Sequence, residues 1–277
     1  MKRLPTLIVS ALAALALNAT PAVAHSLSED TDTLPTMTGQ PAGQVIMADH
    51  RGQGRVIEAF GDIGHADHIV VLVPGVGWNA AALLDESEAT RRHPAVQARG
   101  ILAEARKLDP HSRTAVVVWL DYDAPSTVDL DAAESTRAIQ GAPRLAAFVN
   151  MEAKRADVSV VCHSYGAVVC AHAASRMNAR DIVAVGAPGM DVSTVGQLHA
   201  RGRIWAGTAP DDPISMVPHT TIGDLGHGAD PTDPGFGARR LPTGTSHGHN
   251  GYFTPGTLSL VNITRIALGR FDLVGDR

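Results

Sequence analysis

The chain has 277 residues, of which 44% are hydrophobic, 18% charged and 4% aromatic, and its formal net charge is −5. This composition is typical of a globular protein with a sizeable core, and it excludes collagen-like, coiled-coil and disordered chains. The mildly acidic balance and the lack of a basic stripe in the sequence argue against a nucleic-acid partner.

The first 24 residues have the features of a secretory signal peptide. Two basic residues precede an apolar run over residues 7–17, and a small-residue cleavage motif ends at Ala24. The apolar run is shorter than the about 20 residues that a membrane-spanning helix needs, so we expect no stable membrane span. The sequence therefore predicts a signal peptide over residues 1–24 and a secreted protein.

Residues 25–43 are rich in Ser, Thr, Asp and Pro, which predicts a flexible N-terminal arm. Residues 44–277 contain continuous apolar runs, typical of strands that are buried on both faces. These runs are residues 68–75, 114–120, 158–162, 181–186 and 203–207, and a β-leaning stretch at residues 55–60 precedes them. Helical patterns follow several of them, at residues 98–108, 142–149 and 255–268. The alternation predicts one α/β domain with a mostly parallel central sheet and helices on both faces.

A serine stands where the apolar run 158–162 gives way to a helix of small residues. The motif C-H-S-Y-G places Ser164 at the apex of this turn. A nucleophile elbow needs small residues two positions before and after its serine, because the strand and the helix approach closely there. Gly166 meets one requirement, and Cys162 replaces the usual Gly at the other. We interpret Ser164 as a nucleophile; the alternative is a buried serine that caps a helix.

The acid and the base of a catalytic triad should follow the serine in chain order. Asp212 is the preferred acid, because Pro213 stiffens the loop after residues 203–207, and Asp211 is the alternative. A solvent-exposed Asp-Asp-Pro turn is the non-catalytic interpretation. The loop over residues 244–253 offers two histidines as the base, and position does not choose between them. All histidines that follow the acid are candidates: His219, His227, His247 and His249.

An oxyanion hole needs two backbone donors near the serine. The glycine-rich loop after the run 68–75 lets the backbone approach Ser164. We expect the N–H groups of Val76 and Tyr165 to be these donors. A site of this kind uses no cofactor and no metal.

Cys162 and Cys170 are the two cysteines of the chain. They lie in one strand-turn-helix unit, and we interpret them as free buried thiols, because buried Cys commonly packs as a small hydrophobe. A disulfide, which secretion would permit, is the less favoured alternative.

Several ordered motifs resemble an α/β-hydrolase family that is known only as a domain of unknown function. They are W-L-x-Y-D-A-P at 119–125, the C-H-S-Y-G elbow, A-P-G at 187–189, D-P-I at 212–214, H-G-A-D-P at 227–231 and H-N-G-Y-F at 249–253. The resemblance runs from about residue 68 to residue 269 and implies an α/β-hydrolase fold. It also implies Ser164 as nucleophile, Asp212 as acid and His249 as base, since the His-x-x-Tyr segment of the family aligns on His249. Cys162 and Asp121 depart from the pattern, because the family often has Gly at both positions.

These features predict a secreted serine hydrolase that cleaves a small-molecule or lipid-like carboxylic ester through an acyl-enzyme. An acyltransferase or an amidase would use the same triad. A third hypothesis is a divalent-metal site built from the four histidines and from Asp211, Asp212, Asp224 and Asp230, although these residues lack the His-x-x-x-His spacing of helical metal sites. The last is a hydrolase fold that binds without catalysis.

Overall fold

The structure is a computed structural model that describes residues 42–87 and 89–276. The predicted signal peptide and almost all of the predicted arm lie outside the described residues. Among the residues that are described, no helix is both long enough and apolar enough to cross a membrane.

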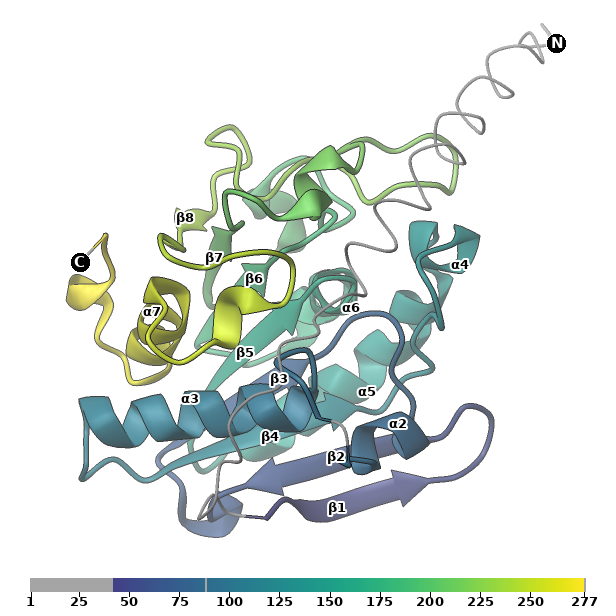
Figure 1. Cartoon of the computed structure of the whole chain (residues 1–277). Coiled ribbons are helices and arrows are strands. Elements are labelled where there is room, and N and C mark those ends of the chain that lie inside the picture. The colour runs from purple at the N-terminus through teal and green to yellow at the C-terminus, as the bar shows by residue number, and fades with distance from the viewer. Residues whose placement is uncertain (1–41, 88, 277) are drawn as a thin grey trace, which may run out of the picture.

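An eight-stranded sheet forms the centre of the fold, in the order β1-β2-β4-β3-β5-β6-β7-β8 (Figure 1). The strands are β1 Gln44–Asp49, β2 Arg55–Phe60, β3 His68–Val73, β4 Thr114–Leu120, β5 Asp157–His163, β6 Asp181–Val185, β7 Arg203–Gly207 and β8 Arg239–Arg240. Six neighbouring strands are parallel to one another, in the order β4-β3-β5-β6-β7-β8, whereas β2 pairs antiparallel with β1 and β4. The predicted mostly parallel sheet is therefore confirmed.

Helices cover both faces of this sheet (Figure 1). The longer ones are α3 Pro94–Leu108, α5 Thr136–Glu152, α6 Gly166–Ala173 and α7 Leu258–Ala267, and two short ones are α2 Ala80–Leu84 and α4 Leu130–Ala133. Helices α3 and α7 pack together on one face, and α5 packs on α6. The predicted stretches 98–108 and 142–149 lie within α3 and α5, and the stretch 255–268 extends beyond both ends of α7. Helices α3 and α7 begin after the capping residues His93 and Thr257.

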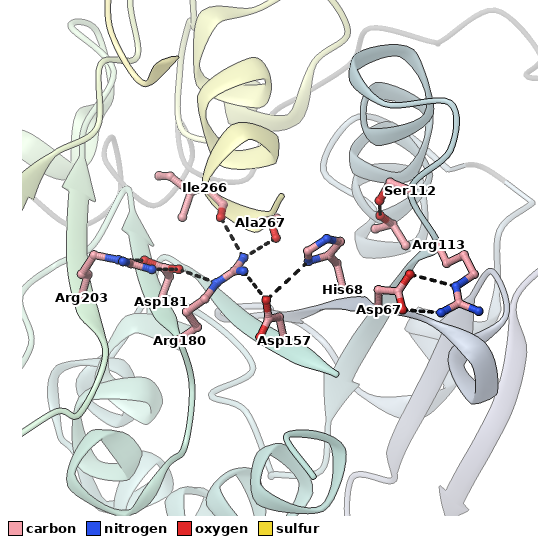
Figure 2. Close-up of polar contacts among 11 residues, drawn as sticks. Asp67, His68, Ser112, Arg113, Asp157, Arg180, Asp181, Arg203, Ile266 and Ala267 are labelled. Carbon is pink, nitrogen blue, oxygen red and sulfur yellow. Dashed lines mark hydrogen bonds and ion pairs between the residues drawn. The ribbon is translucent and has the colours of Figure 1, made fainter. Parts of the chain in front are cut away.

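The amino ends of the parallel strands carry a network of charged side chains (Figure 2). Arg203, the first residue of β7, donates to both carboxylate oxygens of Asp181, the first residue of β6, at 2.7 and 2.9 Å. Arg180 contacts Asp181 and Asp157, and it also donates to the last carbonyl groups of α7. The network therefore ties α7 to one edge of the sheet, and Ser164 follows β5 at the opposite, carboxyl edge.

Candidate active site

Ser164 lies at a sharp turn between β5 and α6. Its φ angle is +56°, a left-handed conformation that is uncommon for a residue other than glycine. Its N–H donates to the carbonyl of Val185 at the end of β6, at 3.0 Å. A Cβ atom on Gly166 would overlap the carbonyl oxygen of Val73, so glycine is required where α6 begins beside β3. These features match the geometry that a nucleophile elbow requires.

Cys162 and Cys170 form a disulfide, so the interpretation of two free thiols is wrong. The turn at Ser164 folds α6 back beside the end of β5, which leaves the two Cα atoms 6.4 Å apart, within reach of a disulfide. Their spacing in the sequence does not reveal this proximity, because it depends on the turn between them. The disulfide thus joins the two elements that meet at Ser164.

Asp212 and His249 form a buried pair next to this turn. Nδ1 of His249 lies 2.9 and 3.0 Å from the two carboxylate oxygens of Asp212 and donates to them. The other ring nitrogen, Nε2, is then the one able to accept a proton. A Cβ atom on Gly186 would lie 2.9 Å from Asp212 Oδ2 and 3.2 Å from His249 Cε1. Since Gly186 directly follows Val185, the pair lies beside the backbone that holds Ser164.

Further donors fix the carboxylate of Asp212. The Tyr252 hydroxyl donates to Oδ2, and the Ile214 N–H donates to Oδ1 at 2.8 Å. Burial by itself raises the pKa of Asp212, but the hydrogen bonds from His249, Tyr252 and Ile214 outweigh burial and lower this pKa. The carboxylate is therefore ionised at neutral pH and holds the His249 ring in one orientation. Tyr252 carries a role that the sequence analysis did not assign, although its motif was noted.

The alternative acid and base also form a pair, but at the surface. Nδ1 of His247 lies 3.1 Å from Asp211 Oδ2, and the two side chains are 82% and 55% exposed. Their exposure leaves them in solvent, whereas Asp212 and His249 are buried. Burial thus distinguishes the Asp212–His249 pair from the Asp211–His247 pair, a choice that position in the sequence left open.

The histidines and acids of the metal hypothesis do not converge. Nε2 of His219 lies 3.8 Å from Asp230, and Nδ1 of His227 lies 2.9 Å from Asp191. Over residues 42–87 and 89–276, no group of three or more His, Cys, Asp or Glu residues is arranged to hold a metal ion.

The two predicted oxyanion donors have unused N–H groups. Within the described part of the chain, neither the Val76 N–H nor the Tyr165 N–H donates to an acceptor. Gly75 lies so close to Ser164 that an added Cβ atom would be 2.7 Å from the serine Cβ. The Tyr122 hydroxyl, which donates to the carbonyl of Pro74 at 2.8 Å, fixes this loop. The loop therefore brings an available donor to the side of the serine.

The Tyr165 side chain is anchored by a second polar cluster. Its hydroxyl donates to the carbonyl of Glu134 at 2.7 Å, and its ring lies edge-on to that of His227, with centroids 5.6 Å apart. His227 is itself held by the carboxylate of Asp191 at 2.9 Å and by the carbonyl of Ala132 at 2.8 Å. The cluster thus fixes the residue that follows Ser164, a role that the motif around His227 did not reveal.

His163 supports the backbone of His249. Its Nε2 donates to the His249 carbonyl at 2.7 Å, and the two rings lie 4.8 Å apart. Burial and the neighbouring His249 lower the pKa of His163 to about 3. It is therefore a neutral hydrogen-bond donor to the backbone of His249.

The two departures from the family pattern have separate partners. Cys162 is part of the disulfide. Asp121 follows β4 and pairs with Arg144, whose Nε lies 3.2 Å from Oδ1. Neither residue hydrogen-bonds to Asp212 or to His249 among the residues described.

Comparison with known sequences places this geometry in context. A family model described as alpha/beta hydrolase matches residues 49–222. Two uncharacterized proteins of Mycobacterium tuberculosis, MT2140 and Rv2079, are each 32% identical to this chain over 260 residues. The match covers 80% of this chain and 38% of each relative, so the chain spans well under half the length of these curated relatives.

Solved structures of hydrolases resemble the chain at low sequence identity. A fungal esterase from Rhizomucor miehei has a TM-score of 0.48 and 15% identity, covering 93% of this chain and 91% of its own. A dienelactone hydrolase from Anabaena variabilis has a TM-score of 0.47 and 14% identity, covering 84% and 96%. An arylesterase has a TM-score of 0.46 and 11% identity, covering 95% and 93%.

Proposed function

Because this chain belongs to the α/β-hydrolase family, we propose that it is a serine hydrolase that cleaves carboxylic esters with Ser164, His249 and Asp212. The observation that carries the proposal is the buried Asp212–His249 pair beside a serine with a φ angle of +56°. A strained serine next to a histidine with a fixed tautomer is what nucleophilic catalysis needs.

The reaction would proceed in two halves. Ser164 Oγ attacks the ester carbonyl while His249 Nε2 accepts its proton, and the N–H groups of Val76 and Tyr165 stabilise the oxyanion. His249 then returns the proton to the departing alcohol, which leaves an acyl group on Ser164. Water attacks this acyl-enzyme, with His249 again as the base, and the carboxylic acid is released. Asp212 stays ionised and stabilises the imidazolium in both halves.

We propose in addition that the protein is exported and that residues 1–24 are removed. The disulfide supports this proposal, because disulfides form and persist in oxidising compartments. Sequencing the N-terminus of the secreted protein tests it, and we expect the first residue to be His25.

Labelling with a serine-reactive fluorophosphonate tests the proposed nucleophile. We expect the wild type to be labelled and Ser164→Ala to lose both labelling and turnover of 4-nitrophenyl esters. Ser159→Ala is a matched control, because this serine of β5 is buried and its hydroxyl has no hydrogen-bond partner in the described chain. An unlabelled wild type would refute a serine hydrolase, and labelling that survives in Ser164→Ala would place the nucleophile elsewhere.

A further inference from the structure

A guanidinium group lies against the loop that holds the Val76 donor. Nη2 of Arg92 donates to the carbonyl of Val76 at 3.5 Å, and a Cβ atom on Gly77 would overlap this same nitrogen. The guanidinium carbon lies 5.1 Å from the centroid of the Trp78 ring, within cation–π range. One loop therefore holds the Arg92 side chain through three consecutive residues.

Arg92 is a cation without a carboxylate partner. Among residues 42–87 and 89–276 its guanidinium makes no ion pair, and its one side-chain hydrogen bond is the long one to Val76. Its Nε and Nη1 groups have no protein acceptor, yet neither is sealed from solvent. Arg99, by contrast, makes a two-point ion pair with Glu86. Arg92 thus keeps unused donors that face accessible space.

This unpaired charge carries an electrostatic cost. Burial lowers the pKa of Arg92, because part of its hydration is lost without a compensating anion. Arg203, by contrast, is neutralised by the buried carboxylate of Asp181. An arginine that is partly desolvated and unpaired in the free protein is arranged to receive an anion that is not part of the chain.

Two observations place Arg92 near the reacting groups. Gly75, two residues before the Gly77 that contacts Arg92, touches Ser164, and two residues of chain span at most about 7 Å. After burial and the effect of His249, the charge of Arg92 further lowers the pKa of His163, whose ring lies 4.8 Å from that of His249. A group bound by Arg92 would therefore lie several bonds from a carbonyl carbon bound at Ser164.

We propose that Arg92 binds a carboxylate of the substrate. The protein would therefore act on esters that carry a negatively charged carboxyl group in addition to the ester bond that is cleaved. The inference rests on the proposed serine hydrolase function and specifies its substrate class. The planar fork of a guanidinium matches a carboxylate, and the Trp78 ring beneath it limits the movement of Arg92.

A pair of esters with equal acyl length tests this substrate class. We expect the wild type to have a kcat/KM at least tenfold higher for the 4-nitrophenyl monoester of adipic acid than for 4-nitrophenyl hexanoate. A second pair, 4-carboxyphenyl and phenyl hexanoate, places the charge on the alcohol side. The preference for at least one anionic ester should fall as NaCl is added, because salt screens the attraction.

Substitution of Arg92 should remove this preference selectively. In Arg92→Gln we expect kcat/KM for the anionic ester to fall at least tenfold more than that for its neutral partner. Arg92→Lys should retain part of the preference. Arg106→Gln is the matched control, because it removes the same charge from an exposed position in the last turn of α3, and it should leave the preference unchanged.

A result that contradicts the role of Arg92 differs from one that contradicts the proposed serine hydrolase function. An equal loss on both esters in Arg92→Gln would mean that Arg92 positions the Val76 peptide, and it would overturn the inference. Labelling and neutral-ester turnover in a wild type without charge preference would overturn the inference alone, and this comparison needs no variant to fold. A wild type that neither reacts with fluorophosphonate nor cleaves any ester would overturn the proposed function as well.

Discussion

At the scale of single residues, burial separates two Asp-His pairs that have similar geometry. The hydrogen-bond distances are 2.9 Å for Asp212–His249 and 3.1 Å for Asp211–His247. The His249 side chain is 5% exposed, whereas that of His247 is 82% exposed. Water screens and reorients the second pair, so it contributes little energy and fixes no tautomer.

Single substitutions test this difference. We expect His249→Ala to lower kcat/KM for an ester by about a thousandfold or more, because the serine loses its base. His247→Ala should retain most of the activity. The measurement is ester turnover by variants whose circular dichroism spectra match that of the wild type. The reverse result would make His247 the base.

At the scale of elements, β2 contains a carboxyl group whose ionised form is disfavoured in the folded protein. Glu58 is 5% exposed, and its Oε2 has no hydrogen-bond partner within the described chain. Burial and the nearby charge of Glu86 raise the pKa of Glu58 to about 7, although the Arg99 charge opposes them. The folded protein therefore keeps a proton on Glu58 at a pH where an unfolded chain has released it.

This raised pKa predicts a pH dependence of stability. Between the ordinary value of 4.5 and about 7, the folded state binds more protons than the unfolded state, so the free energy of unfolding falls as the pH rises. We expect a fall of about 2 kcal/mol, allowing for solvent screening of a group near an edge strand. Glu58→Gln should remove this fall in the free energy of unfolding. Urea unfolding at pH 5 and pH 8 measures the change, and an unaltered pH dependence in the variant would contradict the assignment to Glu58.

The junction of β5 and α6 contains the disulfide. It closes a short loop around Ser164, and loop-closure entropy gives such a bond about 2.5 kcal/mol of stability. We expect the double variant Cys162→Ala/Cys170→Ala to lose about this amount in urea unfolding. Addition of a reductant should destabilise the wild type and leave the double variant unchanged. If thiol alkylation of the unreduced, unfolded wild type finds free cysteines, the bond is absent.

At the scale of the whole molecule, local sequence signals predicted the architecture. They could not predict contacts that form only when distant parts of the chain pack together. Continuous apolar runs predicted the buried central strands. The strand β1 also contains four consecutive apolar residues, at 45–48, but this short run is largely exposed at the sheet edge, and it was not assigned as a strand. The elbow motif predicted Ser164 from adjacent residues. Arg92 belongs to no motif, because its place beside Val76 arises only when residues far apart in the chain are packed together.

The proposed catalytic groups and the buried ion network lie at opposite ends of the parallel strands. The carboxyl edge of the sheet carries Ser164 and the loop of Val76, and the amino edge carries the ion network around Asp181 (Figure 2). Asp181 is fully buried and accepts hydrogen bonds from Arg203, Arg180 and the Trp205 indole, so its removal leaves a buried indole and two partly buried guanidinium groups without this acceptor.

We therefore expect Asp181→Asn to destabilise the protein by about 3 kcal/mol, because one partner of a buried ion pair is lost. The rate of fluorophosphonate labelling of the folded variant, measured well below its melting temperature, should match that of the wild type. Asp276→Asn is the control for a lost ion pair, since Asp276 and its partner Arg240 are 67% and 73% exposed, and we expect a loss of at most about 0.5 kcal/mol. Slower labelling of folded Asp181→Asn would instead mean that the amino edge of the sheet sets the position of the serine at the carboxyl edge.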